Sequence, residues 1–385
     1  MPEAKHKIFC SAGELSGDIH AAALIVEASH RHPELSFFGL GGKEMEKAGF
    51  RLLHSMEETA VMGFTEIISS LPRILKVRRS LSKAIKEERP EAVLLIDSPD
   101  LNFHLAKVAF SLNIPVIYYI CPQIWAWRAG RIKFLKRFTK RRALIFPFEK
   151  NYYEERKVSC DLVGHPLLDE IVALPKVELR AKLNLAEDSP VLGIFPGSRL
   201  GMFKELSPVM FETAFRLWKL IPDLRLLVAM APTLTKELYQ KALAPYPEML
   251  QNVQLLVSQS REILGASDAA LLSSGTSVME ATILGTPMVV AYKVSALSWF
   301  LARALVKVPF AAINNLIAGR RVVGEYLQED CAPDKLTNAL LPLLTGGPQR
   351  ELMIHELSKI RASLGGPGAS KRVLSIIAQE TGLSQ

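Results

Sequence analysis

The segment "AVLLIDSPDLNFHLA", residues 92–106, decides the fold class, because a short apolar run leads directly into a turn and a helical pattern. Units of this kind are typical of parallel α/β structure. They recur through the first half of the chain, where the other strand-like runs are "KIFCSAGE" (7–14), "IPVIYYI" (114–120), "ALIFPF" (143–148) and "CDLVG" (160–164). The pattern predicts a doubly wound sheet.

The series restarts after a proline-rich and charged stretch, residues 166–190. The later runs are "VLGIFPGS" (191–198), "RLLVAMA" (225–231), "VQLLV" (253–257), "DAALLSSG" (268–275) and "PMVVAY" (287–292). At 385 residues the chain is also longer than one core usually supports. We therefore predict an α/β protein with two doubly wound, Rossmann-like domains that face each other across a cleft.

The expected boundaries follow from these runs. Residues 1–168 form the first domain, 169–190 a linker and 191–366 the second domain. Residues 367–385, which follow the "GGPG" breaker, are expected to form a helix that packs back on the first domain. Ligands should bind at the loops that follow the strands, because ligands collect at the carboxyl ends of the strands in such sheets.

Composition indicates a globular protein with anionic partners. The chain is 49% hydrophobic and 22% charged, with a formal net charge of +8. Its start has too short an apolar run for a signal peptide, and its most apolar stretch, residues 296–313, contains Arg303 and Lys307. Four scattered cysteines suggest neither disulfides nor a zinc site, so a cytoplasmic location is expected.

The first loop, in "IFCSAGELSGDIHAAAL" (8–24), contains Gly13 and Gly17 and opens a helix. Glycines allow close approach of the backbone to a ligand, and a helix start attracts anions. Glu14 adds a carboxylate at the end of the strand. A simple tight turn with a helix cap remains the alternative.

Asp97 ends the very apolar run of the opening segment. A carboxylate there is partly desolvated, which raises its pKa and suits it to act as a general base. The alternative is that Asp97 or Asp100 caps a helix that starts near Leu101. Because the chain has no Asp-x-Asp triplet to hold a metal and a diphosphate, we expect metal-independent chemistry without a cofactor.

Two loops of the second half are suited to a nucleotide. One contains Ser198 and Arg199, whose guanidinium can bind a phosphate through two parallel hydrogen bonds. The other starts a helix with Gly275 and Thr276, and its Glu280 can accept hydrogen bonds from ribose hydroxyls. A purely structural turn is the alternative for the second of these loops.

Together these motifs resemble the lipid-A-disaccharide synthase family, glycosyltransferases of the two-Rossmann-domain, GT-B type. The resemblance runs along nearly the whole chain, through "SAGELSGDIHAA", "LLIDSPDLNF", "YYICPQIWAWRAGRI", "FPFEKNYY", "VGHPL", "PGSR", "SSGTSVMEA" and "NNLIAGRRVV". It implies that a UDP-linked diacylglucosamine donates its sugar to a diacylglucosamine 1-phosphate, which gives a β-1,6-linked disaccharide and UDP.

The resemblance also implies roles for residues. Asp97 matches the proposed base, with Glu14 and Gly17 in the first loop of the family. The donor-binding positions are Ser198, Arg199, Gly275, Thr276, Glu280 and Asn315. One position departs from the family pattern, because this chain has Asn314 where the family usually has a proline.

Acylated, phosphorylated substrates imply work at the cytoplasmic face of the inner membrane. Residues 118–142 contain Trp125, Trp127 and eight Lys or Arg, among them Arg128, without a carboxylate. They are expected to meet anionic lipid or the acceptor, although a core position for the tryptophans and a solvated helix face are the alternatives. Apolar residues at helical spacing form a second candidate for acyl contact: Phe64, Ile67, Ile68 and Leu71.

Two other classes compete with this interpretation. A UDP-N-acetylglucosamine 2-epimerase has a similar fold but needs no lipid-facing segment. A basic RNA-binding protein leaves Asp97 and the paired loops unexplained, so no nucleic acid partner is expected. A homodimer remains open.

Overall fold

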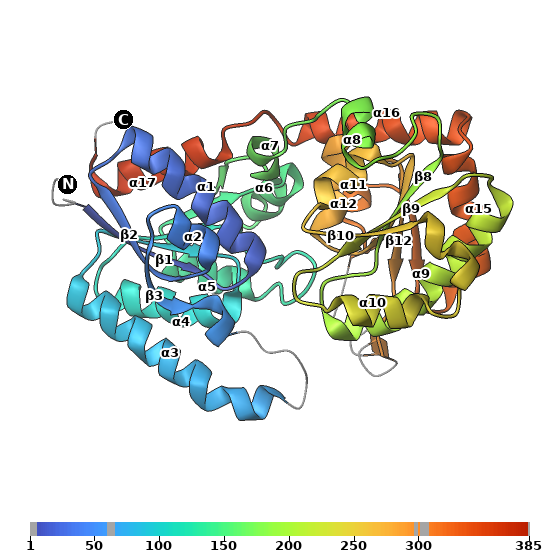
Figure 1. Ribbon diagram of the computed structural model, residues 1–385. Coiled ribbons are helices and arrows are strands. Elements are labelled where there is room, and N and C mark those ends of the chain that lie inside the picture. The colour runs from blue at the N-terminus through green and yellow to red at the C-terminus, as the bar shows by residue number, and fades with distance from the viewer. Residues whose placement is uncertain (1–5, 60–65, 296–298, 301–307, 384–385) are drawn as a thin grey trace. The chain divides into compact units, whose positions relative to one another are not determined.

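The computed structural model describes residues 6–59, 66–295, 299–300 and 308–383, with the backbone alone for residues 66–70. The chain divides into two compact units (Figure 1). The first comprises Met1–Glu170 and Leu364–Gln385, and the second Ile171–Ser363.

The first unit is built on a seven-stranded sheet in the order β3-β2-β1-β4-β5-β6-β7, and every described strand pair in it is parallel. Its strands are β1 (His6–Ala12), β2 (Leu35–Gly41), β3 (Arg51–Ser55), β4 (Ala92–Ile96), β5 (Val116–Tyr119), β6 (Arg141–Leu144) and β7 (Asp161–Leu162). All five β4 residues are buried, as a strand covered on both faces requires.

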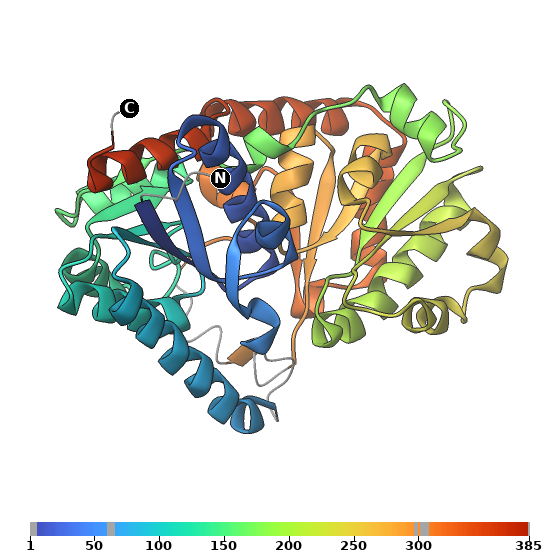
Figure 2. The same ribbon diagram turned by 60° about the vertical axis from the view of Figure 1, so that its left-hand side comes forward.

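Helices cover both faces of this sheet (Figures 1 and 2). They are α1 (Leu15–Arg31), α2 (Lys43–Lys47), α3 (Glu66–Glu88), α4 (Pro99–Ser111), α5 (Arg131–Phe138), α6 (Pro147–Glu154), α7 (Leu167–Glu170) and α17 (Ala369–Thr381), with a 3₁₀ turn η1 (Met56–Glu58). The helix α17 packs against α1, and the Asp169 carboxylate accepts hydrogen bonds from Gly368 N and Ser370 N at its start.

The second unit has a six-stranded parallel sheet in the order β10-β9-β8-β11-β12-β13. Its strands are β8 (Val191–Phe195), β9 (Arg225–Met230), β10 (Val253–Val257), β11 (Ala269–Ser273), β12 (Met288–Tyr292) and β13 (Gly324–Leu327). Its described helices are α8 (Lys176–Lys182), α9 (Leu200–Leu220), α10 (Lys236–Leu243), α11 (Ser260–Ala266), α12 (Thr276–Leu284), α14 (Ile313–Ala318), α15 (Pro333–Leu344) and α16 (Pro348–Ser363), with 3₁₀ turns η2 (Pro247–Asn252) and η3 (Gln328–Asp330).

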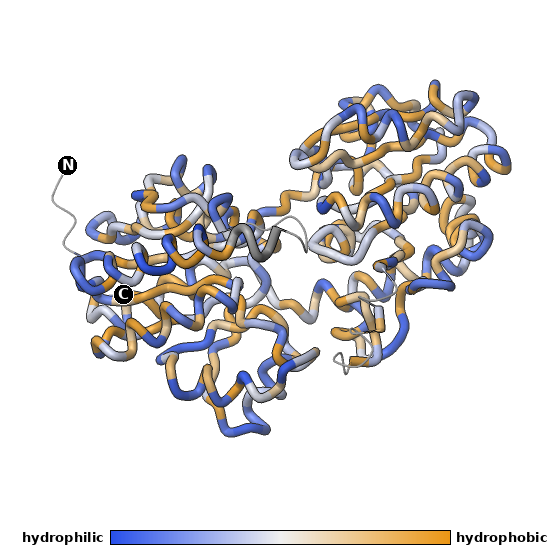
Figure 3. Tube along the Cα trace, turned by 90° about the horizontal axis from the view of Figure 1, so that it is seen from below, coloured by the Kyte–Doolittle hydropathy of each residue, from blue (hydrophilic) through white to orange (hydrophobic). Residues whose placement is uncertain are grey.

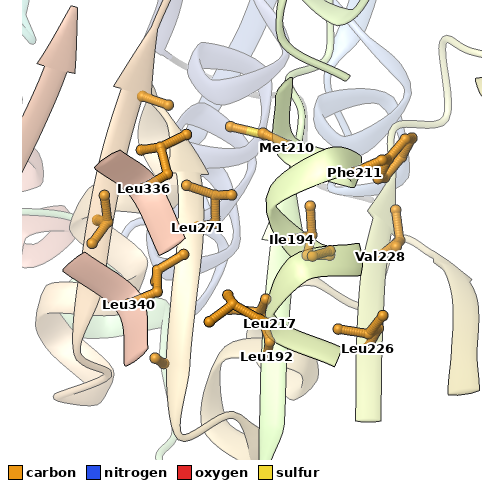
Figure 4. Packing of buried hydrophobic residues seen from close by; sticks show 14 of the residues in the cluster. Leu192, Ile194, Met210, Phe211, Leu217, Leu226, Val228, Leu271, Leu336 and Leu340 are labelled. Atoms are coloured by element: carbon orange, nitrogen blue, oxygen red, sulfur yellow. The ribbon is translucent and has the colours of Figure 1, made fainter. Parts of the chain in front are cut away.

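Alternate residues of the second sheet supply two separate cores. Leu192 and Ile194 of β8 pack with α9 and α15 on one face, as Figure 4 shows. Val191 and Phe195 of the same strand pack with α8, α11 and α12 on the other face. Because strand side chains alternate between faces, one apolar strand serves both cores. Along the helices of both units, hydrophilic residues alternate with hydrophobic ones (Figure 3).

The predicted pair of doubly wound sheets is thus confirmed, with two differences in detail. Residues expected to form a linker include α8, and Leu179 and Leu183 are buried in a core of the second unit. The strands β2, β3 and β13 were not anticipated. Gly39 in β2 has φ +140°, and an added Cβ would lie 2.2 Å from Cys10 O, so only glycine allows the strands to approach so closely there. Because glycine is unfavourable within strands, it makes the segment harder to predict as a strand from its sequence.

Among the helices of the described residues, none combines the length and the apolar character that crossing a bilayer requires.

Candidate active site

Several of the predicted site residues lie at the topological switch point of their sheet. In the first sheet the strand order reverses between β1 and β4, and in the second between β8 and β11. At such a switch point the connections leave in opposite directions, which opens a crevice at the carboxyl ends of the strands. The loops after these four strands hold Glu14, Asp97, Arg199 and Gly275.

Asp97 and Glu14 follow neighbouring strand ends. Ala12 of β1 pairs with Ile96 of β4, so the two carboxylates emerge side by side. Asp97 is half-buried, and its burial together with the negative charge of Glu14 raises its pKa to about 6. The Ser98 backbone and the charge of His20 oppose this rise. A carboxylate tuned in this way can accept a proton near neutral pH.

The turn that carries Asp97 has an unfavourable backbone. Asp97 and Ser98 have φ values of 46° and 41°, in the left-handed region that non-glycine residues seldom adopt. Such strain persists only where the surroundings fix it. Here the Asp97 carbonyl accepts hydrogen bonds from Tyr118 Oη at 2.6 Å and from Asn102 Nδ2 at 2.8 Å.

Asn102 is the centre of this support. It is fully buried, and its Nδ2 also donates to Ile96 O at 3.0 Å while its Oδ1 accepts from Ser11 Oγ at 2.7 Å. The helix cap proposed as the alternative for Asp97 is wrong, because Ser98 is the N-cap of α4. Asp100 is exposed and pairs with Arg131 at 3.1 Å.

His20 and Glu170 were missed by the sequence analysis. Both are largely buried, and His20 Nδ1 lies 2.5 Å from Glu170 Oε1. The positive charge of a protonated His20 favours the ionised form of Asp97. Nothing in the sequence indicates this pair, because its members are 150 positions apart.

The two glycines of the first loop serve close packing. A Cβ on Gly13 would lie 2.5 Å from Ser98 Oγ, so the loop contacts the Asp97 turn directly. Gly17 was expected in the first loop, where it could contact a ligand. It is instead buried in α1, where an added Cβ would lie 3.4 Å from Ala12 Cβ and 3.5 Å from Ile96 Cγ2.

In the second unit, the loop after β8 exposes Ser198 and Arg199. Gly197 has φ +101°, which turns the chain sharply before α9, and Arg199 is the N-cap of that helix. The Ser198 carbonyl accepts a hydrogen bond from Thr233 Oγ1 at 2.7 Å. Arg199 therefore follows a fixed turn at the start of a long helix, a position that suits an anion.

The loop after β11 presents a second helix start. Gly275 is the exposed N-cap of α12, and a Cβ placed on it would meet nothing within 4 Å. Thr276 is exposed beside it. Glu280, one turn further, is half-buried and accepts a hydrogen bond from Arg261 Nε at 3.3 Å. Arg261 is a further polar residue of this loop region that the sequence analysis did not identify.

Asn315, expected to bind the donor, has its amide fully engaged inside the protein. Its Oδ1 accepts from Val322 N at 2.7 Å and Val323 N at 2.9 Å, and its Nδ2 donates to Val323 O and to Glu325 Oε1. An asparagine amide has two donors and two acceptor sites, so none is left for a ligand. Asn315 therefore shapes the loop.

Asn314 occupies the position where proline is usual in the related family. It is the second residue of α14, where a backbone N–H has no partner within the helix. Its Oδ1 accepts from Asn315 N at 3.2 Å, which satisfies one such group. The helix α14 thus starts without proline.

The two tryptophans of residues 118–142 differ in environment. Trp125 is half-buried, and its Nε1 donates to Glu149 Oε1 at 3.0 Å; burial raises the pKa of Glu149 to about 7. Trp127 is 37% exposed, with the guanidinium of Arg128 over its ring at 4.3 Å. Trp127 and Arg128 are therefore exposed, whereas Trp125 is not.

The cations of this segment lie in two kinds of environment. Arg141 pairs with Asp161, and the buried Arg142 donates to carbonyls such as Ser159 O at 2.7 Å. Lys133 and Lys136 are exposed on α5 and form no ion pair with any residue that the structure describes. Arg131 also pairs with Asp100 at 3.1 Å, so Arg131, Arg141 and Arg142 are engaged within the protein.

Only part of the apolar stretch 64–71, which includes the start of α3, belongs to the described residues. Phe64 lies outside the described residues, as do the side chains of Ile67 and Ile68. Leu71 is 51% exposed.

Comparison with known proteins identifies the class. The crystal structure of the UDP-GlcNAc 2-epimerase from Neisseria meningitidis, bound to UDP-GlcNAc, matches 97% of this chain and 100% of that chain with a TM-score of 0.68 but 14% identity, which establishes the fold alone. Relatives share much more sequence. The lipid-A-disaccharide synthases of Anaeromyxobacter sp. (strain K) and Myxococcus xanthus (strain DK1622) are 41% and 38% identical, over 97% of this chain and 97% of each relative.

The fold, the two switch-point loops and these relatives define a glycosyltransferase with two Rossmann-like domains. A profile of lipid-A-disaccharide synthetases matches residues 8–375. The chain belongs to the lipid-A-disaccharide synthetase family, as the resemblance predicted.

Two adjacent tyrosines allow a matched test of the Asp97 turn. Tyr118→Phe removes the hydroxyl that donates to Asp97 O, so the free energy of unfolding should fall by about 1 kcal/mol. Tyr119→Phe is the control, because the buried Tyr119 hydroxyl has no hydrogen-bond partner among the described residues. Its removal should be neutral or stabilising. Urea denaturation measures both, and equal losses would contradict the proposed support.

Proposed function

We propose that this protein joins UDP-2,3-diacylglucosamine to 2,3-diacylglucosamine 1-phosphate and releases UDP, in lipid A biosynthesis. Family membership supports the substrates. The observation that carries the chemistry is the position of Asp97, a half-buried carboxylate at the first switch point with a pKa raised to about 6. At neutral pH it is ionised and can take up a proton.

In this proposal Asp97 acts as the general base. It removes the proton from the primary hydroxyl of the acceptor while that oxygen attacks the anomeric carbon of the donor sugar. The bond between that carbon and the UDP oxygen breaks, and UDP leaves with the electron pair. One direct displacement inverts the α-linked donor to a β-linked product and needs a single base. Glu14 assists by keeping the pKa of Asp97 high.

The second unit is proposed to bind the UDP part of the donor. Arg199 and Ser198 would hold the diphosphate together with the amides of Gly275 and Thr276 at the start of α12. Glu280, positioned by Arg261, would accept hydrogen bonds from the ribose. Because the guanidinium and the helix amides stabilise the charge of departing UDP, the proposal needs no metal.

We further propose peripheral binding to an anionic membrane surface at the cytoplasmic face. The exposed Lys133 and Lys136 of α5, next to Trp127 and Arg128, support this proposal. Each such cation gains on the order of 1 kcal/mol near anionic lipid.

The first test replaces the base. Asp97→Asn keeps the size of the side chain but cannot accept the proton, so turnover should fall by about two to four orders of magnitude. UDP affinity should stay nearly constant, because the donor contacts lie in the second unit. Steady-state kinetics and UDP titration measure these quantities, and full turnover in Asp97→Asn would exclude Asp97 as the base.

The pH profile of the same reaction gives an independent readout. Turnover should rise with pH through about 6, because only the ionised Asp97 accepts a proton. Glu14→Gln removes a negative charge that disfavours ionisation, so it should move this midpoint to lower pH. His20→Gln removes the side chain whose charge lowers the pKa of Asp97, so it should move the midpoint to higher pH. Shifts in the same direction would contradict the electrostatic assignment.

The second test concerns the donor site. Arg199→Ala removes charge-assisted hydrogen bonds of roughly 1.5 to 3 kcal/mol, so UDP affinity should drop about ten- to a hundredfold. Arg216→Ala is the control, because it removes an exposed guanidinium from the same helix, nearly five turns away. Unchanged UDP affinity in a folded Arg199→Ala protein would remove Arg199 from the site.

The third test concerns the membrane. The protein should sediment with anionic vesicles at low salt and much less at high salt, because salt screens exposed charges. Lys133→Gln/Lys136→Gln should weaken this binding by roughly tenfold or more. Lys236→Gln/Lys241→Gln, which removes two exposed cations from α10, should not. Binding that ignores both salt and the α5 substitutions would refute the electrostatic proposal.

A further inference from the structure

A basic hollow lies between α3 and α4 of the first unit, which run side by side in Figures 1 and 2. Its volume is about 430 Å³. Among the described residues that line it, none is acidic, and the polar ones are Arg78, Arg79, Ser82, Lys83, Lys86 and His104. The remaining lining is aliphatic, so it offers no aromatic ring on which a nucleotide base could stack.

The cations of this hollow are arranged by the helix itself. Arg78 and Lys86 are eight residues apart on α3, and Arg79 and Lys83 are four apart, so they form two adjacent rows on one side of the helix. Within the described residues, Arg78, Arg79 and Lys86 form no ion pair. Lys83 has only a 3.7 Å contact with Glu87 of its own helix.

Charges of one sign held together repel one another, and this repulsion destabilises the folded protein unless an anion neutralises them. A surface cluster that merely aids solubility would normally mix both signs. The concave shape adds to the argument, because a hollow concentrates the field of the cations that line it.

His104 faces this cluster from α4. Ser82 Oγ donates its hydrogen to Arg78 O at 2.7 Å, so it accepts from His104 Nε2, 3.1 Å away. Nδ1 is therefore the nitrogen that can gain a proton. Burial, followed by the charges of Arg78, Lys107 and Lys86, lowers the pKa of His104.

We infer that this hollow is a binding site for a phosphate group, carried either by a lipid headgroup or by a soluble phosphate. Two guanidinium groups supply paired N–H donors, and the two lysines and His104 Nδ1 add single donors to the same oxygens. The inference is independent of the proposed glycosyl transfer, since it uses none of the residues assigned to the donor or to the base.

Binding at this site should be coupled to protonation of His104. A bound phosphate offsets the positive charges that disfavour the imidazolium, so it should raise the midpoint of His104 titration. By linkage, phosphate must then bind more tightly as the pH falls through this midpoint.

The experiment titrates full-length protein with inorganic phosphate at constant ionic strength, and separately with vesicles of phosphatidylglycerol in phosphatidylcholine. Histidine NMR follows His104, identified by loss of its signal in His104→Gln. Its midpoint should rise by about one pH unit when the ligand binds. Arg78→Gln/Lys86→Gln should weaken binding roughly tenfold or more, while Lys236→Gln/Lys241→Gln should leave it unchanged.

The two ligands distinguish the sources. If Arg78→Gln/Lys86→Gln selectively weakens binding of vesicles alone, the site is assigned to a lipid headgroup. If it weakens binding of inorganic phosphate alone, the ligand is a soluble phosphate. If it weakens both, the site binds phosphate irrespective of its carrier. The inference is overturned if His104 titrates identically with and without both ligands, or if the α3 and α10 substitutions weaken binding equally. If an α3 variant unfolds, the titration of His104 in the unsubstituted protein, with and without ligand, still tests the inference. UDP release is measured separately, as a check on the transferase site.

Discussion

Parallel pairing of β1 with β4, and of β8 with β11, is the constraint on which the rest of the structure depends. Parallel strands all end at the same edge of a sheet, and at these two pairs the connections leave in opposite directions. No connecting helix therefore crosses the space between the loops at these two strand pairs. Buried apolar strands make this possible, because β4 and β8 are buried along their whole length.

Holding a carboxylate at such an edge has a structural cost. Asp97 and Ser98 adopt left-handed backbone, which costs on the order of 1 to 3 kcal/mol per residue. The buried Asn102 offsets it by binding the carbonyls of Ile96 and Asp97. A buried amide of this kind is stabilising only when its polar atoms are bonded, and Ser11 completes the set. The network thus ties the strand end, the turn and α4 into one rigid support.

The positively charged side chains differ in whether they have partners within the protein. Buried arginines form bonds within the protein. Arg142 donates to backbone carbonyls, and Arg180 pairs with Asp268. Among the described residues, Arg78, Arg79 and Lys86 of α3 and Lys133 and Lys136 of α5 form no ion pair. Charged partners of this chain are therefore expected at those helices.

The sequence by itself determined the number of sheets, their parallel character and the loops that carry Asp97, Arg199 and Gly275, because strand length, apolar runs and turn residues are local properties. Edge strands such as β3, which is only partly buried, gave too weak a local signal. Tertiary structure decided which polar side chains form their hydrogen bonds inside the protein and which stay open to a ligand. Asn315 and Arg142 have side chains that often contact ligands, but both form hydrogen bonds inside the protein. His20 and Tyr118, in contrast, act on Asp97 from other segments of the chain. Hydrogen bonds and charge effects between distant segments depend on how the strands and helices pack, and no local pattern encodes that packing.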